Sequence, residues 1–179
     1  MRLLGVGLQC GVVEVHPHNA VWVCLYKEEE TLLIASIGQY VADIQHIGST
    51  AIPGLVAKPI IDIIVGLKDL ELMGQCIEKL EKLGYEYKGE NGISGRFFFV
   101  KGDAEISTCH LHLVKWQGQF WKSHLAFRDY LRKHKDDVNE YAILKQDLAL
   151  KFPTNRDAYT EAKAHFISGI LKKAEQLLY

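Results

Sequence analysis

The sequence lacks two features: a hydrophobic run long enough to cross a membrane, and a large net charge of either sign. Its 179 residues carry 21 Lys and Arg against 22 Asp and Glu, which gives a net charge of −1. A chain without a basic excess has no overall field that would recruit nucleic acid. No apolar stretch approaches the ~18 residues that a membrane-spanning helix requires. We therefore expect no membrane partner, and the composition carries no strong nucleic-acid signal.

Closely spaced cysteine pairs are also missing. The four cysteines are widely scattered, at positions 10, 24, 76 and 109, and no pair has the spacing of a zinc knuckle. We expect these cysteines to be reduced and mostly buried, which is typical of a cytosolic protein. The apolar N-terminus, residues 1–8, is too short for the hydrophobic core of a signal peptide. These observations predict a cytoplasmic protein.

Linkers, repeats and low-complexity tracts are absent as well. A chain of this length is long enough to bury a substantial core, and its 48% hydrophobic and 24% charged residues are ordinary for a globular protein. We therefore predict a single domain over residues 1–179. Residues 1–11, with three glycines, are expected to form a loose leader.

Hydrophobic patterning predicts an α+β fold, in which a mixed β-sheet with flanking helices is followed by a helical C-terminal half. Short apolar or alternating runs predict strands at residues 12–15, 44–47, 60–65, 85–87, 96–100 and 108–114. The last two would form an antiparallel hairpin. Helical periodicity and capping residues predict helices at residues 19–38, 69–84, 120–134, 137–152 and 157–178.

The stretch at residues 43–67 organises the rest of the chain. Asp62 interrupts an apolar, β-branched run that is typical of a strand buried on both faces. Burying an unpaired carboxylate is costly, so Asp62 should have a cation, a metal ion or several N–H donors beside it. The preceding loop contains Gly48, Ser49 and Thr50, whose small side chains let a bulky anion approach the backbone, and Lys58 adds a positive charge.

His110 and His112 alternate along a predicted strand and should face the same side. Together with Asp62 they would form a set of two histidines and one carboxylate, with His46 as a candidate fourth member. Imidazole ligands favour Zn, Fe, Ni or Cu over Mg. These residues are therefore candidates for metal binding or for general acid–base catalysis. The alternative is that each histidine is a half-buried residue with its hydrogen bonds satisfied.

An anionic ligand would also need cations. The cations available outside the central stretch are Arg96, Lys101, Arg128 and Arg132. Arg128 and Arg132 are one helical turn apart and share a face, although a salt-bridged surface is the favoured interpretation for Arg132. Tyr159 and Lys163 are likewise one turn apart, with packing and a surface ion pair as the alternative roles.

The run of residues 46–62, His-Ile-Gly-Ser-Thr-Ala-Ile-Pro-Gly-Leu-Val-Ala-Lys-Pro-Ile-Ile-Asp, resembles the GrpB family. The resemblance continues through His110-Leu-His112, Trp121, and residues 127–132 and 159–163. Members of this family are thought to share the nucleotidyltransferase fold, and some are fused to dephospho-coenzyme A kinase. The resemblance therefore implies a nucleotidyltransferase-like sheet and names dephospho-coenzyme A kinase as a candidate partner.

In the nucleotidyltransferase superfamily, the Gly-Ser pair holds a triphosphate and carboxylates on the next strand hold divalent metal ions. The resemblance thus implies that Gly48 and Ser49 bind phosphate and that Asp62 binds a divalent metal, either Mg²⁺ or a transition metal. One departure weakens this parallel. The superfamily strand usually carries two acids two residues apart, and here the partner position is Ile60 or Ile64.

Three functions follow from these patterns. The first is binding of a nucleotide or another phosphate-bearing ligand, with metal-assisted nucleotidyl or phosphoryl transfer as the implied reaction. For this function Gly48, Ser49, Thr50, Lys58, Arg96 and Arg128 would bind phosphate, and Asp62, His110 and His112 would be catalytic. The second is a non-catalytic folding or interaction module linked to dephospho-coenzyme A kinase. The third is a metal-dependent hydrolase that uses the two histidines.

Overall fold

A six-stranded mixed sheet forms the centre of the molecule in the computed structural model, which describes residues 5–177. The strands are β1 (Leu8–Gln9), β2 (Val41–Ile47), β3 (Ile61–Leu67), β4 (Tyr85–Tyr87), β5 (Phe97–Gly102) and β6 (Ile106–Lys115). Five strands run in the order β2-β3-β6-β5-β4, and β1 pairs with β6 beside this path. The β3–β6 pair is parallel, whereas the other pairs are antiparallel. The predicted mixed sheet and its β5–β6 hairpin are thus confirmed.

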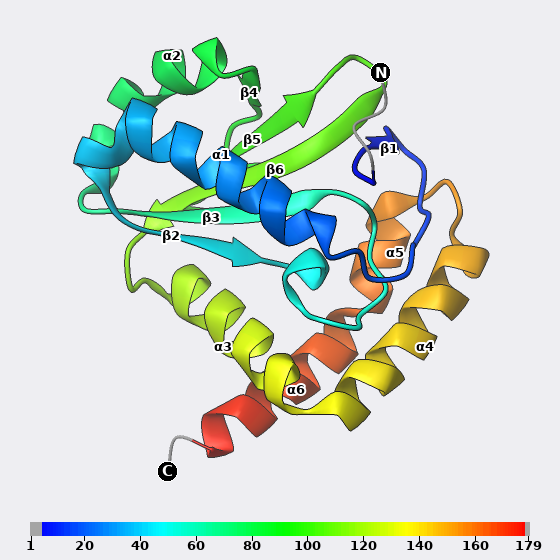
Figure 1. Cartoon of the computed structure of the whole chain (residues 1–179). Helices are drawn as coiled ribbons and strands as arrows, with labels where there is room; N and C mark the ends of the chain where they lie inside the picture. The colour runs from blue at the N-terminus through cyan, green and yellow to red at the C-terminus, as the bar shows by residue number, and fades with distance from the viewer. Residues whose placement is uncertain (1–4, 178–179) are drawn as a thin grey trace.

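Helices cover the sheet and build the C-terminal half (Figure 1). Two of them, α1 (Val21–Ile37) and α2 (Gly74–Lys82), lie near each other at the sheet. The C-terminal half consists of α3 (Gln119–Lys133), α4 (Lys135–Lys151), α5 (Arg156–Ala162) and α6 (Ala164–Gln176). Short 3-10 turns occupy Gly38–Tyr40, Ser49–Ala51 and Leu70–Met73. The fold is α+β, as the hydrophobic pattern predicts.

The two faces of the sheet are packed differently. Ile61, Ile63 and Val65 of β3 belong to the large core that also contains Trp22 and Leu33 of α1. The alternate residue Ile64 packs instead with Val114 of β6 and Trp121 of α3. Because side chains alternate along a strand, Asp62 shares the face of Ile64 and points away from the α1 side. The carboxylate in this apolar run therefore faces the helical half.

The loop between β2 and β3 joins the sheet to the helical half. Its residues Ile52 and Leu55 are fully buried in a second core, together with Leu131 of α3, Tyr141 of α4 and Ile170 of α6. The loop that carries the Gly-Ser pair is thus held by packing on three helices.

The N-terminal segment differs from the expected loose leader. Residues 1–4 lie outside the described part of the chain, but residues 5–11 are docked on the fold. Leu8 is buried in β1, the backbone N–H of Gly7 donates to the carbonyl of Pro59 at 2.7 Å, and Arg156 donates to the carbonyl of Gln9 at 2.9 Å. The strand predicted at residues 12–15 is wrong: these residues form no strand, and the backbone N–H of Val13 donates instead to the carbonyl of Pro153 at 2.8 Å.

Two helix predictions also need correction. The helix expected to begin at Asp137 starts at Lys135, directly after α3, and the Asp137 carboxylate accepts hydrogen bonds from Tyr130 at 2.9 Å and Lys173 at 2.5 Å. Asp137 therefore ties α3, α4 and α6 together and does not cap a helix. The single last helix is divided into α5 and α6 at Lys163.

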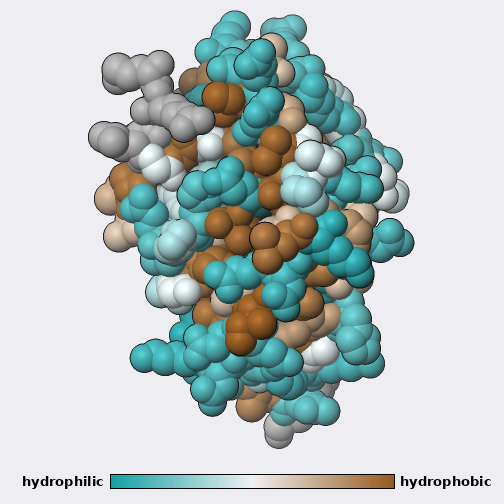
Figure 2. Space-filling model, turned by 90° about the vertical axis from the view of Figure 1, so that its right-hand side faces the viewer, coloured by the Kyte–Doolittle hydropathy of each residue, from teal (hydrophilic) through white to brown (hydrophobic). Residues whose placement is uncertain are grey.

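None of the helices within residues 5–177 combines the length and the apolar character that a membrane crossing demands. On the side formed by α4, α5 and the N-terminal segment, Figure 2 shows apolar side chains along the middle of the face, broken up by hydrophilic ones. The cysteines are free thiols: Cys76 and Cys109 are buried as expected, whereas Cys10 and Cys24 are exposed.

Candidate functional site

A cavity of about 320 Å³ opens between the second face of the sheet and the helical half. Most of the residues singled out in the sequence line it. These are Gly48, Ser49, Thr50, Lys58, Asp62, His110 and His112. The wall is completed by residues from α3, α4, α5 and α6, so the helical half closes a site whose other side is the sheet. Asp62 therefore adjoins a cavity and is not enclosed by protein alone.

Strand register brings the acid and the histidines together. In the parallel β3–β6 pair, Asp62 lies opposite His110, and Ile64 lies opposite His112. Because both strands alternate, Asp62, His110 and His112 lie on the same face of the sheet. The three side chains therefore line the same cavity, as the period of two along the strands predicts, and their role in a functional site stays a prediction.

The carboxylate of Asp62 lies against the imidazole ring of His110. Oδ1 of Asp62 lies 3.3 Å from Nδ1 of His110. Burial alone would raise the pKa of Asp62, but the hydrogen bond from His110 and the positive charge of Lys58 lower it to about 2. Asp62 is therefore ionised at neutral pH, and its contact with Nδ1 fixes the orientation of the His110 ring.

The predicted metal centre is not assembled. Within residues 5–177, no group of three or more His, Cys, Asp or Glu side chains is arranged to hold an ion. Asp62 turns to His110, while His112 is inserted between aromatic rings, with centroids 5.1 Å from Phe98 and 5.8 Å from Phe120. Burial lowers the pKa of His112 to about 3, so this imidazole is neutral at physiological pH.

The Gly-Ser loop combines a strained backbone with a buried anchor. Gly48 has φ 69° and ψ −171°, a conformation essentially restricted to glycine. Thr50 is buried, and its Oγ1 lies 3.0 Å from Nε2 of His46 and 3.4 Å from the carbonyl oxygen of Ile60. Thr50 thus fixes the loop, and Ser49 is the hydroxyl left to meet a ligand. His46 lies outside the cavity wall, stacked on Tyr26, so it is not a fourth member of the site.

Three lysines from three different segments converge on the cavity. Lys58 comes from the loop, Lys145 from the middle of α4, and Lys163 from the junction of α5 and α6. The ammonium groups of Lys163 and Lys58 lie 4.3 and 5.6 Å from the centre of the Tyr159 ring. Lys145 is 2% exposed and donates to the carbonyl of Val56.

Burial and mutual repulsion make these lysines weaker bases than usual. Burial and the charge of Lys58 lower the pKa of Lys163 to about 8. Burial and the charges of the other two lysines hold the pKa of Lys145 well below its ordinary value. The pKa of Lys58 is lowered chiefly by burial. A group that brings negative charge into the cavity would relieve this repulsion.

Two polar atoms in the wall are buried without a hydrogen-bond partner among the described residues. They are the hydroxyl of Tyr159 and Nδ1 of His112. The Tyr159 side chain is fully buried, and burial raises its pKa, so the phenol remains a proton donor. Buried polar groups are nearly always paired, and an orphan in a cavity wall indicates a bound ligand or water.

The predicted cations Arg96 and Arg128 do not line the cavity. Arg96 donates to the carbonyls of Glu90 and Asn91 and lies over the ring of Phe98. Arg128 donates to Oε1 of Gln45 and to the carbonyl of His46, both at 2.9 Å. Their guanidinium groups are occupied by acceptors of the protein itself. Lys101, another candidate, pairs with Glu29 at 2.6 Å.

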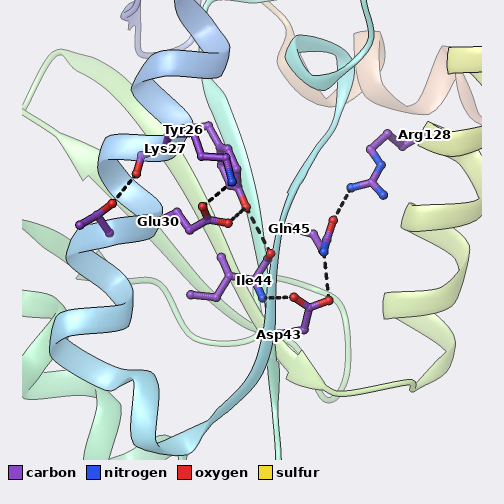
Figure 3. A network of polar contacts seen from close by, with 8 residues as sticks. Tyr26, Lys27, Glu30, Asp43, Ile44, Gln45 and Arg128 are labelled. Atoms are coloured by element: carbon purple, nitrogen blue, oxygen red, sulfur yellow. Dashed lines mark hydrogen bonds and ion pairs between the residues drawn. The ribbon is translucent and has the colours of Figure 1, made fainter.

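Figure 3 shows the network that Arg128 closes. Gln45, which accepts from Arg128, donates to Asp43 at 3.0 Å, and Asp43 in turn accepts from the backbone N–H of Ile44 at 2.8 Å. The hydroxyl of Tyr26 on α1, which donates to Glu30 at 2.5 Å, also lies 3.2 Å from the carbonyl oxygen of Ile44. Arg128 therefore fastens α3 to the edge strand β2 and through it to α1.

Sequence reasoning missed Lys145 and His124 as wall residues. A signal for Lys145 was present. The buried positions of α4 are Val138, Tyr141, Lys145 and Leu148, spaced as the core stripe of an amphipathic helix. A lysine in such a stripe must find a partner inside the protein, and here it finds a carbonyl and a cavity.

Comparison with known proteins places most of the chain in one family. The family model described as "GrpB protein" matches residues 12–173. The chain is 41% identical to the "Glutamate-rich protein GrpB" of Alkalihalophilus pseudofirmus, with 94% of this chain and 99% of that protein covered. It is 38% identical to the "UPF0157 protein YqkA" of Bacillus subtilis, and the match covers 92% of this chain but only 48% of that protein.

A solved structure and a more distant relative extend the comparison. The crystal structure of the conserved protein GrpB from Enterococcus faecalis superposes with a TM-score of 0.86 at 36% identity, covering 92% of this chain and 99% of that one. A "Dephospho-CoA kinase" of Mycolicibacterium paratuberculosis is 22% identical over 90% of this chain and 46% of that protein. On the family match and on these relatives, the chain belongs to the GrpB family.

Proposed function

We propose that the cavity binds the phosphate group of a small molecule. The observation that carries this proposal is that Lys58, Lys145 and Lys163 line one cavity together with Tyr159, whose buried hydroxyl has no hydrogen-bond partner among the described residues. Three ammonium groups with lowered pKa values and one hydroxyl donor match the negative charge and the acceptor oxygens of a phosphate dianion. The Gly48-Ser49 loop lines the same wall. It adds the hydroxyl of Ser49 and, at Gly48, backbone that carries no side chain.

The balance of charge in the wall favours an anion over a resident cation. Asp62 is the one acidic side chain in the described part of the wall, and His110 already accompanies it. One carboxylate does not readily share two metal ions between attacking and leaving oxygens. The donor set therefore does not fit the two-metal centre that the superfamily resemblance implies. In this proposal, the lysines supply the positive charge that metal ions would otherwise supply.

The contact between Asp62 and His110 supports a catalytic role for the same site. A carboxylate on Nδ1 orients the ring and stabilises its protonated form, which leaves Nε2 to exchange a proton with a ligand. A water or hydroxyl that attacks the bound phosphorus would give its proton to Nε2 of His110. Nucleotidyl or phosphoryl transfer and phosphate-ester hydrolysis would both use this proton acceptor.

The match to a dephospho-CoA kinase supports a second candidate function. A chain of this family joined to a kinase could act as an interaction module for that enzyme, with no chemistry of its own. On α4, the exposed side chains of Ile143 and Leu150 lie seven residues apart on one face, as in a helix that packs on a partner. Co-elution of the chain with dephospho-CoA kinase, unaffected by charge removal at Lys145, would support this function.

Titration calorimetry tests the first proposal directly. Inorganic phosphate, AMP, ATP and dephospho-coenzyme A would be titrated in EDTA, in Mg²⁺ and in Zn²⁺. We expect binding of at least one phosphate compound in EDTA, and a loss of at least about tenfold in affinity in Lys145→Met, which keeps the length of the side chain but removes its charge.

The matched control is Lys172→Met, which removes an exposed lysine from α6 outside the cavity wall. This variant should bind like the wild type, since a global change in charge would affect both variants. If no phosphate compound binds under any metal condition, the proposal is wrong. If binding requires a divalent ion and depends on Asp62, the metal-assisted site implied by the superfamily is the better description.

A further inference from the structure

The cavity has a charged end and an apolar end. Lys163, the N-cap residue of α6, and Ile167 and Leu171 within α6 all line the cavity at intervals of four residues, so they lie on one face of this helix. At a rise of about 1.5 Å per residue, Leu171 lies about 12 Å along the helix axis from Lys163. The cavity therefore extends for two helical turns away from the lysines.

Aromatic and aliphatic side chains make up the far end. Phe127 of α3 lines the cavity with Ile167 and Leu171 of α6. Tyr141 of α4 joins the two ends of the cavity, since its ring centre lies 5.8 Å from that of Phe127 and 5.3 Å from the ammonium group of Lys145. An inorganic anion would fill the lysine end and leave this apolar surface in contact with water.

We propose that the ligand is a phosphate monoester whose alcohol carries an aromatic or aliphatic group, with the phosphate at the lysines and the apolar group between α3 and α6. This inference rests on the proposed function and specifies the substrate class of the same site. Burying an apolar group adds free energy in proportion to the area removed from water. The apolar end would thus make the affinity for such esters higher than the affinity for free phosphate or for polar phosphate esters.

Volume limits the size of the apolar group. A cavity of about 320 Å³ lies at the lower end of the range for small-molecule sites, which is about 300 to 1,000 Å³. Such a space fits one ring or a short chain beside the phosphate. The ligand is therefore a small soluble ester rather than a two-chain lipid.

The test compares three probes by titration calorimetry in EDTA: inorganic phosphate, glycerol 3-phosphate and phenyl phosphate. We expect phenyl phosphate to bind at least about tenfold more tightly than either of the other two, since the free energy gained by burying one ring is large enough for this difference in affinity. In Leu171→Asn this preference should fall below about threefold. The control Leu150→Asn changes a leucine that is 83% exposed on α4, and it should keep the full preference.

The outcomes separate this inference from the function on which it rests. Equal affinity for phenyl phosphate and inorganic phosphate in the wild type would overturn the inference and leave phosphate binding in place. Absence of binding for all three probes would overturn both. The comparison among probes uses the wild-type protein, so a folding defect in Leu171→Asn would not remove the test.

Discussion

Gly48 and Asp62 approach each other so closely that a Cβ atom on Gly48 would lie 2.4 Å from Oδ2 of Asp62. The same Cβ would lie 3.0 Å from Cβ of Asp62, so rotation of the carboxylate alone would not relieve the contact. The glycine that begins the loop thus rests on the strand that carries the acid. The position of Ser49 relative to Asp62 and His110 depends on this contact.

Replacing Gly48 by Ala should therefore damage both stability and the site. We expect Gly48→Ala to lower the free energy of unfolding by at least about 2 kcal/mol, because the backbone strain and the clash with Asp62 act together. Urea unfolding measures the loss, and phosphate titration should show weakened binding.

Gly54→Ala is the matched control for this effect. Gly54 also has positive φ, 82°, but an added Cβ there would meet nothing within 4 Å. Its substitution should cost only about 1 kcal/mol, from backbone strain alone. If both variants lost the same free energy of unfolding, the close contact between Gly48 and Asp62 would not contribute to the cost of Gly48→Ala.

Arg128 should be structural, in contrast to its predicted role in phosphate binding. We expect Arg128→Ala to lower the free energy of unfolding by about 3 kcal/mol, since its loss leaves the Gln45 side chain and the His46 carbonyl without their donor. Phosphate affinity should change by less than about threefold. Arg132→Ala is the comparison, because Arg132 is 40% exposed and donates to the Ala51 carbonyl at 2.9 Å. A stable Arg128→Ala protein that no longer binds phosphate would restore the predicted role.

Local patterns predict which residues gather on the sheet side of the cavity. The sequence singles out Asp62 because a carboxylate in an apolar strand needs a partner, and the period of two places His110 and His112 on one face. The structure adds the parallel register that pairs Asp62 with His110. Register between strands that are far apart in sequence depends on tertiary packing, so local patterns do not determine it.

The helical half of the site was harder to predict. Lys145 reads as a surface residue unless its place in the α4 core stripe is noticed, and nothing local indicates that α4 faces the Gly-Ser loop. The sequence predicts Arg128 as a phosphate ligand because an arginine side chain can donate with the same geometry to a phosphate oxygen or to a carbonyl oxygen of its own chain. Only the fold decides which acceptor is within reach.

His46 should make the protein less stable in mild acid. Burial lowers the pKa of His46 to about 4, below the ordinary value of 6.5. Between pH 6.5 and 4 the unfolded chain therefore binds a proton that the folded chain does not, and stability falls as the pH falls through this range. The loss from His46 is about 3 kcal/mol when complete. Urea unfolding from pH 7 to pH 4.5 measures it, above the range in which Asp62 titrates.

His46→Gln should flatten this pH profile while keeping a polar group near Thr50. Part of the slope should remain, because His112 has a pKa lowered in the same direction. The control is His165→Gln, which changes an exposed histidine on α6 and should leave the profile as it is. An unchanged slope in His46→Gln would show that this histidine does not resist protonation in the folded state.

Lys163 should couple phosphate binding to proton uptake. Its pKa is lowered to about 8 by burial and by the charge of Lys58, so near pH 8 a substantial fraction of the side chain is neutral in the free protein. A bound dianion stabilises the ammonium form and raises its pKa, so binding at pH 8 should take up protons from the buffer. Affinity should then fall as the pH rises from 7 to 9. Calorimetry at pH 8 in two buffers of different ionisation enthalpy measures the uptake.

Lys163→Arg identifies the group that takes up the proton. Arginine stays protonated over this range, so the variant should take up fewer protons and hold its affinity better at pH 9. Lys58 and Lys145 also have lowered pKa values, so some uptake should remain. Lys172→Arg, on the exposed face of α6, should behave like the wild type. Phosphate binding with no proton uptake at pH 8 would mean that Lys163 does not meet the ligand, and the anion would then have to be assigned to Lys58 and the Gly48-Ser49 loop alone.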